Sequence, residues 1–346
     1  MLLQRFEAVS ERFRNFGRSI LTQQLSGHDF VPNAQFSIST TLFFSLTFIA
    51  LSAFVYAANS EVVEYVIRYD NSSKPQASIE IQIDTHVPPP VLFFYKLQNF
   101  PRNHRRMQHS VCYRQLIGED SSMCETPRLR YRMNKYFCAS AINVSCPEWL
   151  PMCAAVPRCT KYFAPMGAVA ASMFNDTFHL EHSSFGGVPF TTAGIVSEEE
   201  MRMYAESPTS NSKKLCDHAM FQNTIKPESW PKHICEMGGY RNIDFIVWMR
   251  PVAYSSFNKI YRHLDPSGAF ENGLPPGRYT LYIENNFFND GTEKFFKILH
   301  PSWLGTKNRF FFLGFLFLGV IFLFVAIFFL VWFVFFTAKK TAAEID

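Results

Sequence analysis

The stretch FSISTTLFFSLTFIALSAFVYAA, residues 36–58, forms the centre of an uncharged run that covers residues 30–60. A second uncharged run, FFFLGFLFLGVIFLFVAIFFLVWFVFFTA, covers residues 310–338. Each run exceeds the roughly 20 apolar residues that a helix needs to cross the ~30 Å hydrocarbon layer of a bilayer. The two runs therefore predict a membrane protein with two transmembrane α-helices that enclose one large middle segment.

These spans divide the 346 residues into five parts. We expect an N-terminal tail (1–35), a first transmembrane helix (36–58), an ectodomain (59–309), a second transmembrane helix (310–337) and a C-terminal tail (338–346). The first apolar core begins too late for a cleaved signal peptide. Basic residues in the two tails, such as Arg18 and Lys339, favour the cytoplasmic side. Both termini are thus expected in the cytoplasm, with the ectodomain lumenal or extracellular.

The use of cysteine agrees with that topology. All eight cysteines lie in the predicted ectodomain: Cys112, Cys124, Cys138, Cys146, Cys153, Cys159, Cys216 and Cys235. An oxidising compartment favours disulfides over zinc ligands, because close ligand pairs with a matching second pair are missing. Spacing alone leaves on the order of 100 pairings open. Short loops favour Cys112 with Cys124 and Cys216 with Cys235.

Three Asn-x-Ser/Thr triplets also fall between the spans, at Asn71, Asn143 and Asn175. One such triplet is weak information, since it arises by chance. Their placement in the same segment as the cysteines is the useful observation. We expect all three asparagines to be candidate glycosylation sites on a lumenal or extracellular surface.

The middle segment reads mainly as strands and turns. Alternating patterns at 79–84 and 279–284 predict half-buried strands, and the denser apolar runs 91–97 and 243–249 predict strands covered on both faces. Short helices are expected around residues 168–174 and 197–205, the second capped by Ser197. Residues 112–159 indicate a loop-rich insertion. The predicted fold is a mainly β, antiparallel sandwich-like ectodomain with disulfide staples and a few short helices.

Charge excludes one class of function. The net charge of +4 is far from the basic field that a nucleic-acid-binding protein needs. The one dense basic spot contains Arg102, His104, Arg105 and Arg106. It is either a solvated loop or a surface for ion pairing or lipid headgroups.

The first span has a face of small hydroxyl side chains, formed by Ser37, Thr41, Ser45 and Ser52. Such a face allows another transmembrane helix to approach closely. The alternative is that these hydroxyls bond to carbonyls of their own helix. The second span is rich in phenylalanine, which suits packing against lipid and other helices.

Two other classes of protein, a channel subunit and an ectoenzyme, are compatible with this topology. A two-span, ligand-gated ion-channel subunit would share this topology, but the second span has no charged residue to line a pore. An ectoenzyme would need a poised nucleophile or paired acids, and neither G-x-S-x-G nor H-E-x-x-H is present. Asp70, Asp84, Asp244 and Asp290 lie near predicted strand ends, where solvated turn carboxylates are common. We therefore predict no catalytic, cofactor-binding or metal-binding residues.

Six blocks, in order along the chain, resemble signatures of the cell division control protein 50 family. They are FFYKLQNF (93–100) with NHRR (103–106), similar to YY-x-L-x-NF-x-QNHRR; GAVA (167–170) with SMFNDTF (172–178), similar to GAIANSMFNDTF; DFIVWMR (244–250); FNKIYR (257–262), similar to FRKLYR; LPPGRY (274–279), similar to LPAGRY; and SWLGTKN (302–308), similar to SWMGGKN.

The resemblance implies a noncatalytic beta subunit of type IV P-type ATPases, the phospholipid flippases. Such a subunit would pair 1:1 with the catalytic subunit, support its folding, exit from the endoplasmic reticulum and activity, and leave ATP and magnesium chemistry to it. Residence in the endoplasmic reticulum, Golgi, endosomes or plasma membrane would follow. We expect the hydroxyl face of the first span and Asn103, His104, Arg105 and Arg106 to contact this partner.

The chain also departs from the family pattern. Met166 stands where the family has a cysteine, so at least one disulfide of the family is absent or rerouted. Gln23, Gln24 and Leu25 match the N-terminal QQ-x-L-x-AWQP segment only in part. The way in which the N-terminal tail meets a partner is therefore the least defined part of the resemblance.

Overall fold

The computed structural model describes residues 20–22, 33–70, 75–119, 124, 138–144, 156–206, 215–287 and 291–343. It separates into a helical unit, built from the chain up to Ala57 and from Asn308 onward, and an ectodomain unit, Ala58–Lys307. Asn71, Cys146 and Cys153 lie outside the described residues, as do Gln23, Gln24 and Leu25.

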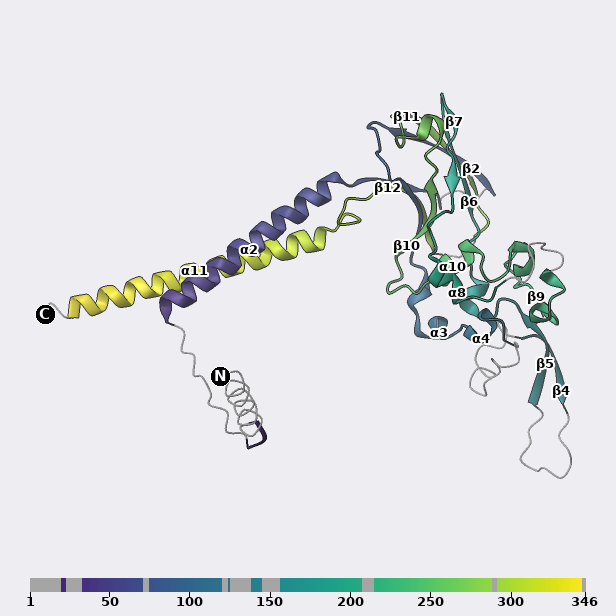
Figure 1. Cartoon of the computed structure of the whole chain (residues 1–346), viewed down its shortest axis with the longest axis horizontal. Helices are drawn as coiled ribbons and strands as arrows, with labels where there is room; N and C mark the ends of the chain where they lie inside the picture. The colour runs from purple at the N-terminus through teal and green to yellow at the C-terminus, as the bar shows by residue number, and fades with distance from the viewer. Residues whose placement is uncertain are drawn as a thin grey trace, which may run out of the picture. The chain divides into compact units, whose positions relative to one another are not determined.

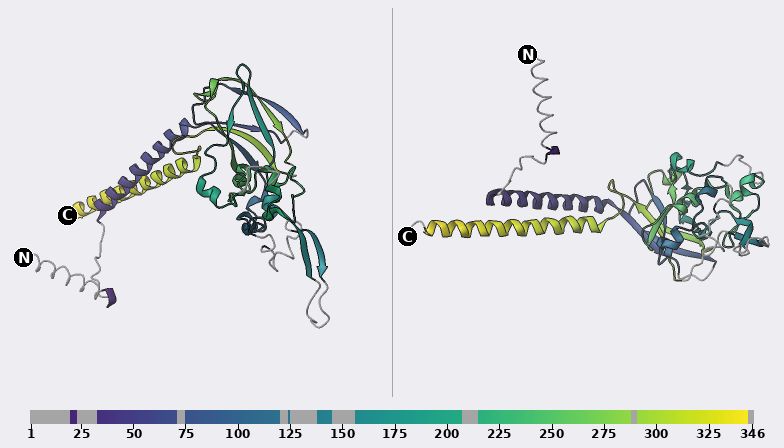
Figure 2. Two further views of the ribbon diagram at one scale, coloured as in Figure 1. Left: turned by 45° about the vertical axis from the view of Figure 1, so that its right-hand side comes forward. Right: turned by 90° about the horizontal axis from the view of Figure 1, so that it is seen from below.

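The helical unit contains α2 (Ala34–Glu61) and α11 (Arg309–Ala343). Both are long and apolar enough to cross a membrane, over Ala34–Glu61 and Arg309–Thr337. The two helices lie side by side in both views of Figure 2. The two spans predicted from the sequence are therefore present as one helix pair.

Small residues let α2 and α11 approach closely. The Ser45 hydroxyl donates to the Gly319 carbonyl at 2.9 Å, and the Ser52 hydroxyl donates to the Phe312 carbonyl at 3.1 Å. A Cβ atom at Gly319 would lie 2.7 Å from Ile49 Cγ1 and 3.1 Å from its backbone nitrogen. Only glycine fits there, since real Cβ contacts are longer. The contact thus combines close backbone approach with interhelical hydrogen bonds.

The ectodomain consists of two large sheets and a smaller third one. Sheet A has the strand order β1-β12-β3-β10-β8, and sheet B has the order β2-β11-β6-β7. The strands of sheet A are β1 (Val63–Arg68), β12 (Glu293–His300), β3 (Leu92–Gln98), β10 (Phe257–Leu264) and β8 (Phe190–Thr191). Those of sheet B are β2 (Gln76–Ile83), β11 (Gly277–Glu284), β6 (Thr177–His182) and β7 (Gly186–Gly187). All pairings within sheets A and B are antiparallel.

One apolar core joins sheets A and B. Phe93 and Phe296 of sheet A are fully buried, and the Phe296 ring lies 4.8 Å from that of Phe178 in sheet B, between centroids. Along β2 and β11 buried residues alternate with exposed ones, as the sequence pattern predicts for half-buried strands. The predicted antiparallel sandwich is confirmed.

The third sheet contains β4 (Cys138–Val144), β5 (Val156–Phe163) and β9 (Thr224–Ile225). β4 and β5 pair antiparallel, and the hairpin projects from the two large sheets in Figure 1. A loop-rich insertion was expected over residues 112–159, and the sequence pattern did not indicate this hairpin within it. Its register shifts near Ser140 break the period that the sequence would otherwise display.

Short helices cover the connections between strands. They are η1 (Pro101–Asn103), α3 (Arg105–Gln108), α4 (Tyr113–Leu116), α7 (Ala168–Ala171), α8 (Glu198–Arg202), η3 (Ala219–Phe221), η4 (Ile234–Met237), α10 (Ile243–Met249) and η5 (Gly268–Phe270). α7 and α8 lie where helices were predicted, and the Ser197 hydroxyl accepts from the Glu200 backbone N–H as an N-cap.

The prediction of a strand over residues 243–249 was wrong, because this segment is α10. Five of its seven residues are buried, so its apolar run has no polar face to reveal the helical period. The Asn242 side chain caps the helix by accepting from the Phe245 N–H at 2.9 Å. The cap before the run, together with Pro251 after it, was the available helix signal.

Candidate functional site

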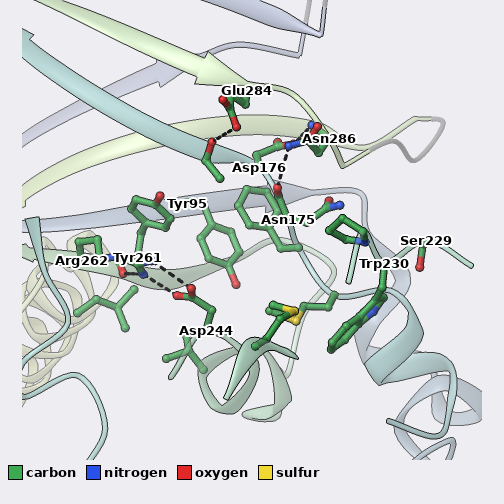
Figure 3. A pocket seen from close by; sticks show the side chains of 17 residues that line it. Tyr95, Asn175, Asp176, Ser229, Trp230, Asp244, Tyr261, Arg262, Glu284 and Asn286 are labelled. Atoms are coloured by element: carbon green, nitrogen blue, oxygen red, sulfur yellow. Dashed lines mark hydrogen bonds and ion pairs between the residues drawn. The ribbon is translucent and has the colours of Figure 1, made fainter. Parts of the chain in front are cut away.

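A pocket of about 320 Å³ brings together four of the six sequence blocks (Figure 3). β3 contributes Tyr95, the segment entering β6 contributes residues 173–177, α10 contributes Asp244 and Val247, and β10 contributes residues 260–262. Ser229, Trp230, Pro231 and Met237 close another side. Residues as far apart in sequence as Tyr95 and Arg262 therefore form one site.

Stacked aromatic rings form the inner wall of this pocket. The rings of Tyr95 and Phe174 lie parallel, 3.9 Å apart between centroids. Phe178 meets Tyr261 edge to face at 5.0 Å, and its backbone N–H donates to the Tyr261 hydroxyl at 3.2 Å. A register shift between Ile260 and Arg262 interrupts the pairing of β10 with β3 at Tyr261. Such an irregularity changes the direction of side chains along a strand.

An ion pair, Arg262 with Asp244, also lines the pocket. Arg262 donates from Nη1 to Asp244 Oδ1 at 2.5 Å and from Nη2 to Oδ2 at 3.0 Å, and its guanidinium lies 4.3 Å from the Tyr261 ring centroid. Burial lowers the pKa of Arg262, but the Asp244 carboxylate outweighs it and the pKa is raised. The pair is electrically neutral and fixes α10 against β10.

Asp176 is a fully partnered carboxylate beside the pocket. It accepts from the Tyr69 hydroxyl, the Asn286 and Phe287 backbone N–H groups and Lys294 Nζ, at 2.9, 2.7, 2.6 and 2.9 Å. Its side chain is 0% exposed and that of Lys294 is 7% exposed. With its acceptor positions occupied, Asp176 holds β12 against the turn that follows β11. This arrangement is that of a structural clamp.

Two buried cations lie at the C-terminal end of α10. Arg102 Nη2 donates to the carbonyls of Trp248 and Met249 at 3.3 and 3.4 Å, and Lys259 Nζ donates to those of Val247 and Arg250 at 2.8 and 2.5 Å. Cations are favourable there because the last carbonyls of a helix lack partners. Burial, and then the charges of Arg102 and Arg250, lower the pKa of Lys259 to about 7.

The residues of the basic cluster seen in the sequence differ in their exposure to solvent. Arg102 is buried, whereas Arg105 and Arg106 are exposed. His104 caps α3 by accepting from the Arg106 N–H at 3.3 Å, and Asn103 donates to the Ala253 carbonyl at 3.3 Å. Only the outer residues of the cluster can therefore meet another molecule.

A broader groove of about 800 Å³ lies beside the pocket, and His104 and Arg106 line it. Its apolar residues include Phe100, Met107 and Phe287. Groove and pocket share Met173, Asn175, Ser229 and Asn286. Two of the four expected contact residues of the ectodomain, His104 and Arg106, thus border a recess next to the motif pocket.

On α2, the predicted hydroxyl face is mostly used within the chain. Ser45 and Ser52 are 0% and 2% exposed, and they bond to α11. The helix that approaches these two side chains is the chain's own second span, and contact of this face with a partner stays a prediction. The Thr41 hydroxyl donates to the Ser37 carbonyl at 2.8 Å. For Thr41, the hydroxyl therefore bonds to a carbonyl of its own helix, as the alternative prediction states. Ser37 is half-buried.

The structure contains the disulfides Cys112–Cys124 and Cys216–Cys235, the two pairs that short loops favoured. Cys138 is disulfide-bonded as well. Met166 packs against Cys112 and Cys124, with Tyr162 alongside. An apolar contact to this disulfide thus stands at the position where the family has a cysteine. The side chain of Cys159 lies outside the described residues.

Among the glycosylation candidates, Asn175 is half-buried at the rim shared by the pocket and the groove. The following threonine, Thr177, donates to Glu284 Oε2 at 2.7 Å. The side chain of Asn143, in β4, is outside the described part of the structure. Glycosylation at all three positions stays a prediction.

Sequence reasoning missed the most buried charges. Lys259 and Lys294 fall within strand patterns where a lysine normally marks the solvent side, and Asp176 looked like part of a glycosylation triplet. Nothing in the local pattern distinguishes these residues from solvated ones. Within the described ranges, no group of three His, Cys, Asp or Glu side chains could hold a metal ion.

These features of the fold and the site are those of a membrane protein with two apolar helices and a disulfide-bonded β-sandwich whose motif residues converge on an aromatic pocket. Residues 47–340 match the model of the LEM3 (ligand-effect modulator 3) / CDC50 family. The chain therefore belongs to that family, as the six sequence blocks indicated.

Curated relatives agree with this assignment. The chain is 32% identical over 208 residues to cell cycle control protein 50C of Macaca fascicularis and 31% identical over 243 residues to cell cycle control protein 50B of Homo sapiens. These matches cover 57% and 66% of this chain, and 52% and 62% of the relatives. ALA-interacting subunit 3 of Arabidopsis thaliana is 26% identical over 312 residues, 82% of this chain and 75% of its own length. The matched region thus spans only about half to two thirds of the two animal relatives.

Proposed function

We propose that this chain is the noncatalytic beta subunit of a phospholipid-translocating P-type ATPase. The match of residues 47–340 to the LEM3/CDC50 family carries the proposal, and the name of the plant relative, an interacting subunit, supports it. The pocket adds support, because three of its four charged lining residues are held in ion pairs, Asp244 with Arg262 and Asp176 with Lys294, and the fourth, Glu284, accepts a hydrogen bond from Thr177. Such a site suits recognition by a folded surface better than proton transfer.

The proposed role has several parts. The chain forms a 1:1 complex with the ATPase, assists its folding and its exit from the endoplasmic reticulum, and supports its activity. Both termini face the cytoplasm, and the complex resides in the endoplasmic reticulum, Golgi, endosomes or plasma membrane. ATP and magnesium are bound by the ATPase. A subunit of this kind changes activity only if it binds one conformation of its partner more tightly than another.

Gentle purification in detergent tests this function. We expect a large P-type ATPase to copurify in equal amount, and its lipid-stimulated ATP hydrolysis to fall when the chain is removed. A homo-oligomer that conducts ions in liposomes would instead support the alternative, a ligand-gated channel subunit. Recovery of the chain alone under conditions that preserve other membrane complexes would contradict the proposal.

The exposed basic residues allow a sharper test of the contact surface. Arg105→Glu combined with Arg106→Glu should reduce recovery of the ATPase, because both side chains are exposed and Arg106 lines the groove. Arg278→Glu on β11 is the matched control, since Arg278 is also an exposed arginine but lies in sheet B. The wild type, the double variant and the control should have the same melting temperature. If they also recover equal amounts of the ATPase, the basic cluster is not part of the interface.

A further inference from the structure

A tight turn that presents two adjacent apolar side chains lies between β12 and α11. Ser302 and Gly305 bond in both directions, from N–H to carbonyl, at 3.0 and 2.8 Å, and the Leu304 N–H donates to the Ser302 hydroxyl at 3.3 Å. Gly305 adopts φ +98°, a conformation that glycine accepts without strain. Trp303 and Leu304 at the tip are 63% and 43% exposed.

Single exposed apolar residues are ordinary on protein surfaces. This turn differs because a tryptophan and a leucine are adjacent at the tip of a hydrogen-bonded loop. Ordering them at an interface costs little further backbone entropy, since the backbone is already fixed. Lys307 and Arg309, both exposed, follow directly. The segment thus combines an aromatic ring, an aliphatic side chain and two cations within seven residues.

Chain connectivity limits how far this turn can be from the membrane surface. Trp303 lies six residues before Arg309, where α11 begins, so the two are at most about 20 Å apart along the chain. On its other side, His300 of β12 pairs with Val63 of β1, and Val63 follows the last residue of α2, Glu61, by two positions. The turn is therefore followed by chain that enters α11 and preceded by a strand whose end pairs with the start of β1, just after α2.

We propose that Trp303 and Leu304 insert into the interfacial layer of the lumenal or extracellular leaflet, where Lys307 and Arg309 contact lipid phosphates. Tryptophan is favoured at that depth because its ring is apolar and its indole N–H is polar. Basic side chains next to a span bind anionic headgroup oxygens. The turn attaches the ectodomain to the bilayer in addition to the covalent links to α2 and α11. This attachment does not depend on which protein the chain assembles with.

Trp303 fluorescence in nanodiscs tests this proposal. The full chain and its Trp303→Phe variant are reconstituted in phosphatidylcholine and phosphatidylserine lipids, with or without bromine on the acyl chains near the glycerol. The difference between the two proteins isolates the emission of Trp303 from that of the other four tryptophans, Trp149, Trp230, Trp248 and Trp332. We expect the Trp303 component to be blue-shifted, quenched by brominated lipid and protected from aqueous acrylamide.

Tyr254 provides a matched control in the same ectodomain. It is 75% exposed and lies three residues before Phe257, at the end of sheet A opposite to His300. Tyr254→Trp, made in the Trp303→Phe background, should respond to acrylamide and ignore brominated lipid. If the Trp303 component behaves like this control, the proposal is wrong. It is also wrong if lipid quenching of Trp303 disappears once a copurified ATPase is present, because a protein then covers the turn.

Discussion

At the residue scale, the ectodomain is organised by buried charges that have defined partners. Asp176 with Lys294 and Arg262 with Asp244 neutralise each other, whereas Arg102 and Lys259 are held by helix carbonyls. A buried pair of charges adds little net stability, but removing one partner is costly. Substitutions at these positions should therefore affect folding far more than substitutions of surface ion pairs.

Asp176→Asn should destabilise the ectodomain by about 3–5 kcal/mol, because it leaves the Lys294 ammonium buried without its counter-charge. The Asn-x-Thr pattern at 175–177 is retained, so a change of glycosylation signal does not confound the result. Unfolding by denaturant in detergent measures the loss. Glu198→Gln, which removes an exposed i,i+4 pair with Arg202, is the control and should leave the midpoint unchanged. Equal midpoints for both variants would contradict the clamp.

Lys259 should make stability rise with pH. The unfolded chain keeps this proton up to the ordinary pKa of 10.5, whereas the folded chain releases it near pH 7. Between these values the unfolded state binds more protons, so raising the pH favours folding, by at most about 5 kcal/mol over the window. Below pH 7 the Lys259 amine is protonated in both the folded and the unfolded chain, so the full free-energy cost of burying its charge opposes folding.

Lys259→Met tests this expectation, since methionine has a similar length and no charge. The melting temperatures of wild type and variant are measured from pH 6.5 to 9.5. As pH rises, the melting temperature of the wild type should increase relative to that of the variant. Subtraction removes the contributions of other groups, among them Arg102, Arg250, Glu200 and the facing Tyr95. A difference that does not vary with pH would show that Lys259 keeps its proton in the folded state.

At the element scale, the helix pair depends on one glycine. Gly319→Leu should separate α2 from α11, because its Cβ would overlap Ile49 and displace the Ser45 hydrogen bond. We expect a lower melting temperature in detergent by size-exclusion fluorescence. Gly314→Leu is a close control on the same helix, since a Cβ there meets nothing within 4 Å. If both variants melt alike, close approach at Gly319 is not what holds the pair.

Predictability from sequence also differs between elements. The two spans and strands β2 and β11 were predicted correctly, because their period or length is visible locally. α10 was misassigned since a helix buried on nearly all sides has the same apolar density as a buried strand. The hydroxyl face of α2 is visible in the sequence, and in the structure Ser45 and Ser52 of this face contact α11. Sequence spacing shows that a helix can pack there but not which helix does.

At the scale of the whole molecule, the proposed topology has a direct test. Tags at both termini should be cleaved by protease added to intact microsomes, while the ectodomain remains protected. Peptide N-glycosidase should reduce the mass of the protein, and Asn175→Gln should remove one glycan from it. A protected terminal tag, or cleavage of the ectodomain in sealed vesicles, would overturn the assignment of sides.

The two membrane spans, the disulfide-bonded and mainly β middle segment, and the family can be predicted from the sequence. These features depend on local composition, on period and on the order of short motifs, all of which are visible along the chain. Three other features became known from the folded chain: the motifs meet around one pocket, Arg102 and Lys259 cap α10, and Ser45 and Ser52 hydrogen-bond within the internal helix pair. Those facts depend on contacts between distant residues, where burial rather than residue type sets whether a charge or hydroxyl is a surface group or part of the core.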